Sequence, residues 1–267
     1  PADLSGIENC KRFMNSISDK KISVFINNAG FGLCGSFLET DEQKELLMID
    51  VNIKAVHFLT KEVLEIMEFE LMVSKNKDGK LVGHITDGQG FVDNLRDHGV
   101  EVKGKKIAVA GGGGAATAIQ VQCALDGARE ITIFNKKDAF FERTLATAEK
   151  IKAAVPGIVV NVYDIDDVAK MTEEILSSDI FANATIVGMK PMDDLSVVKD
   201  LSAFHKDLVV CDAVYNPEET KLLKEAKEAG CKCVGGKGML LWQGVAAFKL
   251  FTGQDMPVEE VKEKFFS

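Results

Sequence analysis

The chain has 267 residues, of which 46% are hydrophobic and 27% are charged, a composition typical of a globular protein with one large or two ordinary cores. Its formal net charge of −9 argues against nucleic acid and against an anionic membrane surface as partners. The sequence contains no apolar run of transmembrane length and no signal segment at its start.

The first 68 residues contain alternating helix and strand patterns. Residues 3–18 predict a helix with an apolar face, and residues 22–27 (ISVFIN) predict a buried strand that leads into the sequence NNAG, residues 27–30. Residues 40–41 (Thr-Asp) are suitable helix caps, and a long helix containing residues 48–68 is expected after them.

The pattern changes from residue 75 onward. The dipeptide Asp78-Gly79 predicts the turn of a hairpin. Asp87 then stands at the start of a helix that we expect to end near Gly99. A carboxylate at this position can take part in chemistry, or it can simply cap the helix.

Residues 105–127 predict a unit that binds a pyrophosphate group. A buried strand over residues 107–110 leads into a four-glycine turn, and a helix follows and runs to Gly127. Glycines allow the backbone to approach a ligand closely, and the free N–H groups at the helix start attract phosphate. We therefore expect a dinucleotide cofactor beside Gly111, Gly112, Gly113, Gly114 and Ala115.

Strand and helix patterns alternate through the rest of the chain. Strands are expected at residues 130–134, 159–165, 180–185, 207–215 and 231–236, and helices at residues 166–177, 220–230, 238–253 and 257–266. Regular alternation of this kind predicts an α/β fold with a doubly wound parallel sheet. Residues 1–74 would form a smaller α/β region ahead of it.

The six cysteines are scattered along the chain, and only Cys231 and Cys233 are close in sequence. Their C-x-C spacing is not that of a zinc knuckle and no second pair completes it, so we expect no metal site. Scattered cysteines are typical of reduced thiols in a cytoplasmic protein.

The front region resembles the middle of a classical short-chain dehydrogenase. The resemblance rests on NNAG after a strand and on DVNIKAVHFLTK about twenty residues later. It implies that residues 27–30 lie beside the adenosine half of a dinucleotide and that Asn52 matches the family's structural and catalytic asparagine. The family's Tyr-x-x-x-Lys pair is missing, because Tyr163 and Tyr215 are each followed four places on by an acid.

Residues 75–267 resemble the dinucleotide-binding, Rossmann-like half of a shikimate or quinate dehydrogenase. Six motifs occur in the order of that family: DGKLVGHITDG, AGGGGAATA, IFNKKD, NATIVGM, DAVYNP and GGKGMLLWQGVAAF. The resemblance implies hydride transfer between NAD(P) and a ring hydroxyl or ketone of shikimate, quinate or dehydroshikimate. A small-molecule substrate is the expected partner, and a homodimer is compatible with the family.

The same resemblance implies roles for individual residues. Asp87 would bind the substrate hydroxyl and share in proton transfer, while Tyr215 and Gln243 would face the substrate. The adenosine ribose would lie at Asn135, Lys136 and Asp138, where the acid favours NAD and the cation would suit NADP; we expect NAD, with NADP as the alternative. The remaining cofactor-binding residues would be Asn183, Ala184, Thr185, Val187, Met189, Gly236 and Met239.

Some of these positions also have a purely structural interpretation. Met239 can equally belong to the core, Gln243 can be a packing amide bonded to backbone, and the lysines beside Asp138 can form a solvated turn.

The motif that carries the family's catalytic lysine, N-V-T-x-P-x-K, does not occur in this sequence. Met72 and Val73 occupy the place of the Asn-Thr pair that precedes the hairpin in the family. The chain therefore reads as a mosaic of two families, which a natural fusion, an engineered chimera or a sequence error would each produce. The alternatives to an active dehydrogenase are a binding module that holds the cofactor without turnover and, ranked last, a short-chain alcohol dehydrogenase.

Overall fold

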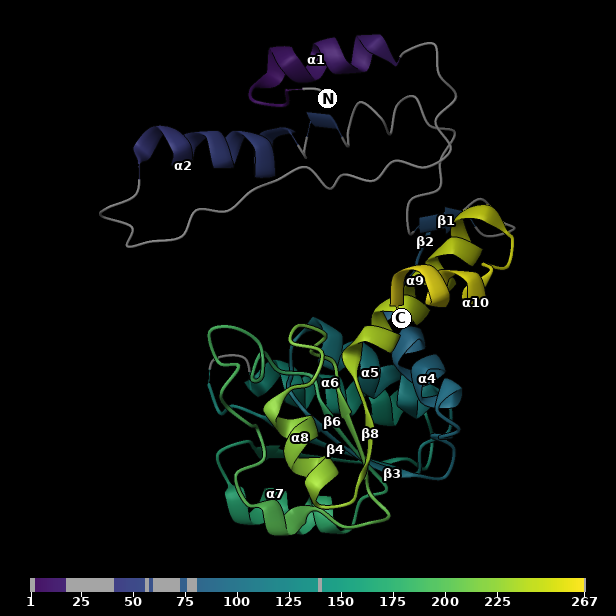
Figure 1. The fold of residues 1–267 in the computed structure, drawn as a ribbon. Coiled ribbons are helices and arrows are strands. Elements are labelled where there is room, and N and C mark those ends of the chain that lie inside the picture. Colours follow the sequence, from purple (N-terminus) through teal and green to yellow (C-terminus); the bar gives the residue numbers. More distant parts are fainter. Residues whose placement is uncertain are drawn as a thin grey trace. The chain divides into compact units, whose positions relative to one another are not determined.

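A computed structural model of the chain describes residues 3–17, 41–55, 58–59, 73–75, 81–138 and 141–266. The chain divides into two units, residues 1–83 and residues 84–267 (Figure 1). The sequence predicts a boundary between residues 74 and 75, where one family resemblance ends and the other begins. That boundary stays a prediction.

The first unit contains short helices and one hairpin. Helix α1 is Ile7–Ser16, and helix α2, Glu42–Ile49, continues as the π-helix η1, Asp50–Ala55. Lys44 N donates a hydrogen bond of 3.0 Å to Asp41 Oδ1, so Asp41 caps α2 as expected. A small core joins α1 to the segment around η1 through Cys10, Met14, Ala55 and Leu59.

The hairpin consists of β1, Val73–Lys75, and β2, Leu81–Gly83, which pair antiparallel. The Asp78-Gly79 turn, the expected strand at residues 22–27 and the NNAG segment at residues 27–30 lie outside the described residues. Asn52 falls within η1, and its backbone is helical.

The second unit is built on a six-stranded sheet in which every neighbouring pair is parallel. Its strands lie in the order β5-β4-β3-β6-β7-β8. Their bounds are β3 Lys106–Ala110, β4 Glu130–Asn135, β5 Val159–Asp164, β6 Ile180–Asn183, β7 Val209–Asp212 and β8 Lys232–Val234. This order is that of a doubly wound, Rossmann-like fold, which confirms the expected fold class.

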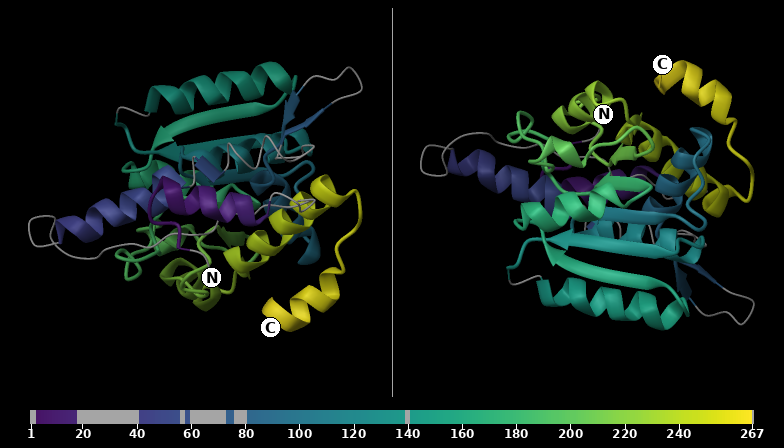
Figure 2. Two further views of the ribbon diagram at one scale, coloured as in Figure 1. Left: turned by 90° about the horizontal axis from the view of Figure 1, so that it is seen from above. Right: turned by 90° about the horizontal axis from the view of Figure 1, so that it is seen from below.

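Helices cover both faces of the sheet (Figure 2). Ile107 and Val109 of β3 face one cluster, while Ala108 and Ala110 face the other, as the alternation of a strand requires. The first cluster includes residues of α4 Asp87–Asp97, α5 Gly114–Leu125, α6 Phe141–Ala154 and α9 Gly236–Thr252. The second includes residues of α7 Val168–Leu176, the 3-10 helix η2 Leu201–Ala203 and α8 Lys221–Glu228.

After α9 the chain forms α10, Val258–Val261, and the π-helix η3, Lys262–Phe266. None of the helices in the described parts of the chain combines the length and the apolar character that a membrane span requires.

Two glycines let α4 approach its neighbours closely. A Cβ atom on Gly88 would lie 2.3 Å from the carbonyl oxygen of Ala118 in α5. A Cβ atom on Gly90 would lie 2.5 Å from the backbone nitrogen of Gln243 in α9. Both distances are shorter than any real contact, so α4 can hold this position only with glycine there.

Candidate functional site

The sheet reverses its winding direction between β3 and β6. These two strands are neighbours, yet β3 leads to β4 on one side and β6 leads to β7 on the other. Ala184, directly after β6, donates its N–H to the carbonyl of Ala110 at the end of β3, at 2.8 Å. Ligands of doubly wound sheets bind at this edge, at the carboxyl ends of the strands.

The glycine turn after β3 has a packed half and an open half. Gly111 has φ +122°, and a Cβ atom there would lie 2.7 Å from the carbonyl oxygen of Ala184. A Cβ atom on Gly112 would lie 2.4 Å from Thr144 Oγ1. By contrast, no atom lies within 4 Å of the Cβ positions of Gly113 and Gly114. The first two glycines are therefore needed for packing, and the last two leave space in front of the start of α5.

A cavity of about 510 Å³ opens at this edge. Its volume is in the range typical of small-molecule sites. Seven of the predicted site residues line it: Gly113, Gly114, Ala115, Ala184, Thr185, Met189 and Tyr215. The other lining residues are Ile186, Lys190, Asp193, Ala213, Val214, Asn216 and Pro217.

A buried carboxylate holds two walls of this cavity together. Asp212, at the end of β7, is 3% exposed. Its oxygens accept hydrogen bonds from Thr220 Oγ1 at 2.6 Å, from Val214 N at 2.9 Å and from Asn183 Nδ2 at 3.0 Å. Burial raises the pKa of Asp212 to about 6, although these three hydrogen bonds act in the opposite direction.

The loop after β6 is fixed by its own polar side chains. Asn183 Oδ1 accepts hydrogen bonds from the backbone N of Thr185 at 3.1 Å and from its hydroxyl at 2.7 Å. The same hydroxyl accepts the N–H of Val187 at 3.1 Å, while Asn183 Nδ2 donates to the carbonyl of Val187 at 2.9 Å. The hydrogen bonds of Asn183 and Val187 thus fix the conformation of the loop, and neither residue lines the cavity.

The residues expected at the adenosine ribose lie at the end of β4, beside the glycine turn. Asn135 is half-buried and donates a hydrogen bond of 3.0 Å from Nδ2 to Thr144 Oγ1. Lys136 and Asp138 are exposed, and none of the three lines the cavity. Their role at the ribose stays a prediction.

Two further predicted residues, Asp87 and Gln243, lie on α4 and α9, two helices that pack closely at Gly90. Asp87 is the first residue of α4 and is half-buried; Thr86 occupies the N-cap position, and no side chain caps the helix. The interpretation of Asp87 as a mere cap is therefore not what the structure shows. Asp87 and Gly90 are three residues apart and share one side of α4, and Gly90 contacts the backbone of Gln243.

The remaining two predicted residues lie at the start of α9. A Cβ atom on Gly236 would lie 2.6 Å from the carbonyl oxygens of both Ala213 and Val214. The helix therefore begins directly against the segment that follows β7. Met239 is 7% exposed and packs in the core cluster beside α4 and α5.

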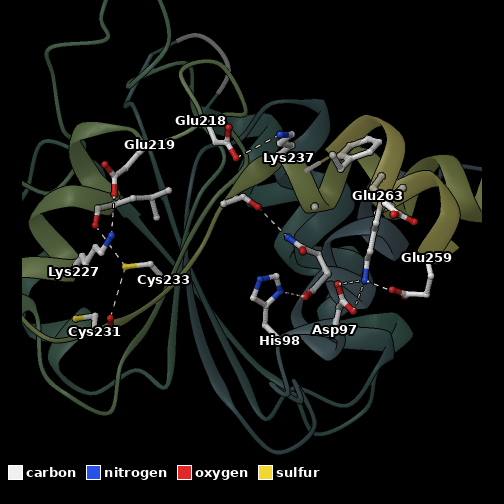
Figure 3. Close-up of a pocket in the computed structure, with 17 residues that line it drawn as sticks. Asp97, His98, Glu218, Glu219, Lys227, Cys231, Cys233, Lys237, Glu259 and Glu263 are labelled. Carbon is white, nitrogen blue, oxygen red and sulfur yellow. Dashed lines mark hydrogen bonds and ion pairs between the residues drawn. The ribbon is translucent and has the colours of Figure 1, made fainter.

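A larger cavity, of about 1140 Å³, lies along the edge strand β8 (Figure 3). Its charged groups are largely paired with one another: Lys262 with Asp97 at 2.8 Å, Lys227 with Glu219 at 3.4 Å and Lys237 with Glu218 at 3.6 Å. Acids outnumber lysines in its lining, which disfavours a cofactor that carries phosphates. The smaller cavity at the β3/β6 edge is thus the better candidate for the cofactor site.

Several residues of the site escaped the sequence analysis. Lys190, Asp193 and Asn216 line the cavity, and Asp212 supports it. A signal for Asp212 was present, because an acid at the end of the apolar run LVVC must be paired when it is buried. In the described parts of the chain, no group of three or more His, Cys, Asp or Glu residues is arranged to hold a metal ion.

Comparison with known proteins finds two families. Residues 236–264 match the family described as the shikimate 5'-dehydrogenase C-terminal domain, and residues 1–92 match the short chain dehydrogenase family. The chain is 50% identical over 195 residues to a shikimate dehydrogenase (NADP(+)) of Streptococcus uberis, covering 72% of this chain and 66% of that protein. It is 46% identical over 188 residues to a quinate/shikimate dehydrogenase of Escherichia coli, covering 70% and 65%.

Solved structures give the same result. Shikimate 5-dehydrogenase from Listeria monocytogenes, in complex with shikimate and NAD, has a TM-score of 0.68 at 45% identity, over 72% of this chain and 65% of that one. Quinate dehydrogenase from Corynebacterium glutamicum, in complex with NAD, has a TM-score of 0.62 at 31% identity, over 73% and 66%. The chain thus spans just under two thirds of the length of these relatives. Both resemblances predicted from the sequence are confirmed.

Proposed function

We propose that the protein is an NAD(P)-dependent oxidoreductase of the shikimate/quinate dehydrogenase type, which transfers hydride between the nicotinamide and a ring carbon of shikimate, quinate or dehydroshikimate. The observation that carries this proposal is the cavity at the β3/β6 edge, which is bounded by the open half of the glycine turn and by Tyr215. The names of the relatives, which include enzymes for shikimate and quinate, support the substrate class.

The residues around this cavity suit a dinucleotide. Gly113 and Gly114 leave room for a pyrophosphate at the start of α5, where backbone N–H groups and the helix dipole favour negative charge. Asn135, Lys136 and Asp138 would hold the adenosine ribose, and the carboxylate leads us to prefer NAD over NADP. The loop of Thr185 and Met189 would border the nicotinamide, which exchanges hydride with the substrate when it is bound.

Chemistry at the substrate would fall to residues of α4, α9 and the segment after β7. Asp87 would accept the proton of the alcohol as hydride leaves, and would return it in the reverse direction. The hydroxyl of Tyr215 and the amide of Gln243 would orient the ring by hydrogen bonds. A cytoplasmic location and a homodimeric state complete the proposal.

A second candidate function is cofactor binding with little or no turnover. It is favoured by the sequence, in which the N-V-T-x-P-x-K segment that carries the family's catalytic lysine does not occur. The ammonium of that lysine would assist proton transfer and stabilise developing negative charge on oxygen. Without it, the cofactor cavity could persist while the rate falls.

The test combines calorimetric titration of NAD and NADP with turnover of shikimate and quinate by the whole chain. Asp87→Asn should lower turnover by roughly two to four orders of magnitude and leave cofactor affinity unchanged. Asp207→Asn, an exposed acid at the other end of the sheet, is the matched control and should change neither.

Each outcome of this test selects one function. Cofactor binding without turnover favours the second candidate, and failure of both cofactors to bind at millimolar concentration contradicts both. Turnover of ordinary secondary alcohols, lost in Asn52→Ala, would instead favour a short-chain alcohol dehydrogenase.

A further inference from the structure

The first residue of the glycine turn is held by a side chain of the helix that follows the turn. Gln120 of α5 donates a hydrogen bond of 2.9 Å from Nε2 to the carbonyl oxygen of Gly111. In the described parts of the chain, no backbone N–H donates to that carbonyl. The side chain of Gln120 thus fastens the start of the turn to the second turn of α5.

Gln120 is a costly residue for its position in the helix. The buried residues of α5 are Ala116, Ile119, Gln120, Cys123 and Ala124, so Gln120 is the polar member of an otherwise apolar set. It is 0% exposed, and its amide oxygen, Oε1, has no hydrogen-bond partner. An apolar side chain of the same length would avoid the cost of burying an unpaired oxygen. What distinguishes a glutamine here is therefore its bond to Gly111.

This hydrogen bond acts on a residue that is restrained on its other sides as well. Gly111 donates its own N–H to the carbonyl of Phe134 in β4 at 2.7 Å, and the carbonyl of Ala184 closes the space beside its Cα atom. With the N–H, the Cα atom and the carbonyl each held, the peptide plane between Gly111 and Gly112 is fixed. That peptide is trans, so the N–H of Gly112 points away from Gln120.

The open half of the turn has no comparable support. Gly113 and Gly114 line the cavity at the β3/β6 edge, and no atom lies within 4 Å of their Cβ positions. In the part of the chain that the structure describes, the N–H groups of residues 112–115 donate to no backbone carbonyl. These are the free donors at which a pyrophosphate would bind. Because the two glycines are not packed, the direction of their N–H groups depends on the residues just before them.

We propose that Gln120 is a positioning residue of the glycine turn: it sets the direction of these N–H groups, and thereby the affinity for a ligand that carries a pyrophosphate. Gln120 itself is buried and would not touch the ligand. The inference rests on the cofactor site of the proposed function and does not depend on hydride transfer.

The experiment compares ligands with and without a pyrophosphate on the whole chain: NAD and ADP by calorimetric titration, and adenosine by NMR shifts at millimolar concentration. Gln120→Met removes the amide and keeps an unbranched side chain of similar length. It should weaken NAD and ADP by about threefold to tenfold, and adenosine by less than about twofold. Gln122→Met is the matched control, because Gln122 lies on the same helix and bonds to Asp126 at 2.9 Å; all three affinities should stay unchanged.

Stability and side-chain shape are tested separately. In Gln120→Met the carbonyl of Gly111 loses its donor, but the unpaired Oε1 is removed as well, so the thermal midpoint should change by less than about 4 °C. Gln120→Leu has a different shape and lacks the same donor, and it should weaken NAD and ADP to a similar extent.

The proposal is overturned if both Gln120 variants bind ADP like the unaltered chain. It is also overturned if adenosine is weakened as much as ADP, or if neither variant folds, since Gln120 would then support the fold and not the direction of the N–H groups. Absence of turnover with shikimate and quinate would contradict the proposed reaction alone, because the readout here is binding. Failure of the unaltered chain to bind NAD and ADP would overturn both.

Discussion

Asn183 at the end of β6 donates a hydrogen bond of 3.0 Å to the carboxylate of Asp212 at the end of β7. The two strands are neighbours in the sheet, and the loops that follow them form two walls of the cavity at the β3/β6 edge. One buried acid therefore sets the distance between these walls. Because it is buried, the same acid makes the stability of the second unit depend on pH.

Asp212→Asn should remove part of this pH dependence. The pKa of Asp212 is raised to about 6 in the folded chain, above its ordinary value of 3.8, so folding favours the protonated form. Its contribution to the free energy of unfolding is therefore present below pH 4 and is lost as the pH rises through 6. The loss is about 3 kcal/mol for a shift of this size.

Urea unfolding at several pH values measures this effect, with fluorescence of the single tryptophan, Trp242 of α9, as the probe of the second unit. Relative to the unaltered chain, the asparagine variant should gain about 1.4 kcal/mol per pH unit between pH 4.5 and 6. If the free energy of unfolding changes with pH in the same way for the two proteins across this range, Asp212 does not titrate there.

Gly90→Ala should destabilise the contact between α4 and α9. The new Cβ atom would lie 2.5 Å from the backbone nitrogen of Gln243, which cannot move without its helix. Overpacking of this kind costs about 1–3 kcal/mol. Gly244→Ala is the matched control, because no atom lies within 4 Å of its Cβ position and the alanine should stabilise α9 by up to about 1 kcal/mol. Equal thermal midpoints for the two variants would refute the close approach.

The alternation of strand and helix was readable from the sequence because the central strands of the sheet, such as β3 and β6, are covered on both faces and are therefore largely apolar. The run KIAVA is buried at every position of β3, as such a strand requires. Strand order was not derivable, since the pairing of β3 with β6 joins segments more than 70 residues apart. No local sequence pattern in either segment predicts that these two strands pair.

The site was predictable where backbone geometry imposes the residue type. The glycine turn is such a case, because Gly111 has a positive φ and stands against the carbonyl of Ala184. Lys190 and Asn216 were missed, since their presence at the cavity depends on how two loops fold and not on a local pattern.

Gly113→Ala should separate cofactor affinity from stability. No atom of the chain lies within 4 Å of the new Cβ atom, so the free energy of unfolding should change by less than about 0.5 kcal/mol. The methyl group would point into the space that we assign to the pyrophosphate, and NAD affinity should fall by about tenfold or more. Calorimetric titration measures the affinity, with Gly244→Ala as a control that retains it. Unchanged NAD binding by the Gly113 variant would place the phosphates elsewhere.

Lys106 and Glu174 form a nearly buried ion pair at the opposite end of the sheet, with 2.7 Å between Nζ and Oε2. Burial acts to lower the pKa of Lys106, but hydrogen bonds and charge from Glu174 and Glu130 outweigh it, so the pKa is raised. Lys106→Met should therefore destabilise the second unit by about 3 kcal/mol, because it leaves the buried Glu174 carboxylate with only Lys170, at 3.3 Å, and the hydroxyl of Thr132, at 3.1 Å.

The double variant Lys106→Met, Glu174→Leu should recover at least half of this loss, since it removes the buried Glu174 carboxylate that the single variant leaves without Lys106. A double-mutant cycle from urea unfolding at pH 7 gives the coupling free energy, which should exceed about 1 kcal/mol. Purely additive losses would mean that the two side chains are stabilised by their other partners, Glu130 for the lysine and Lys170 for the carboxylate, and not by each other.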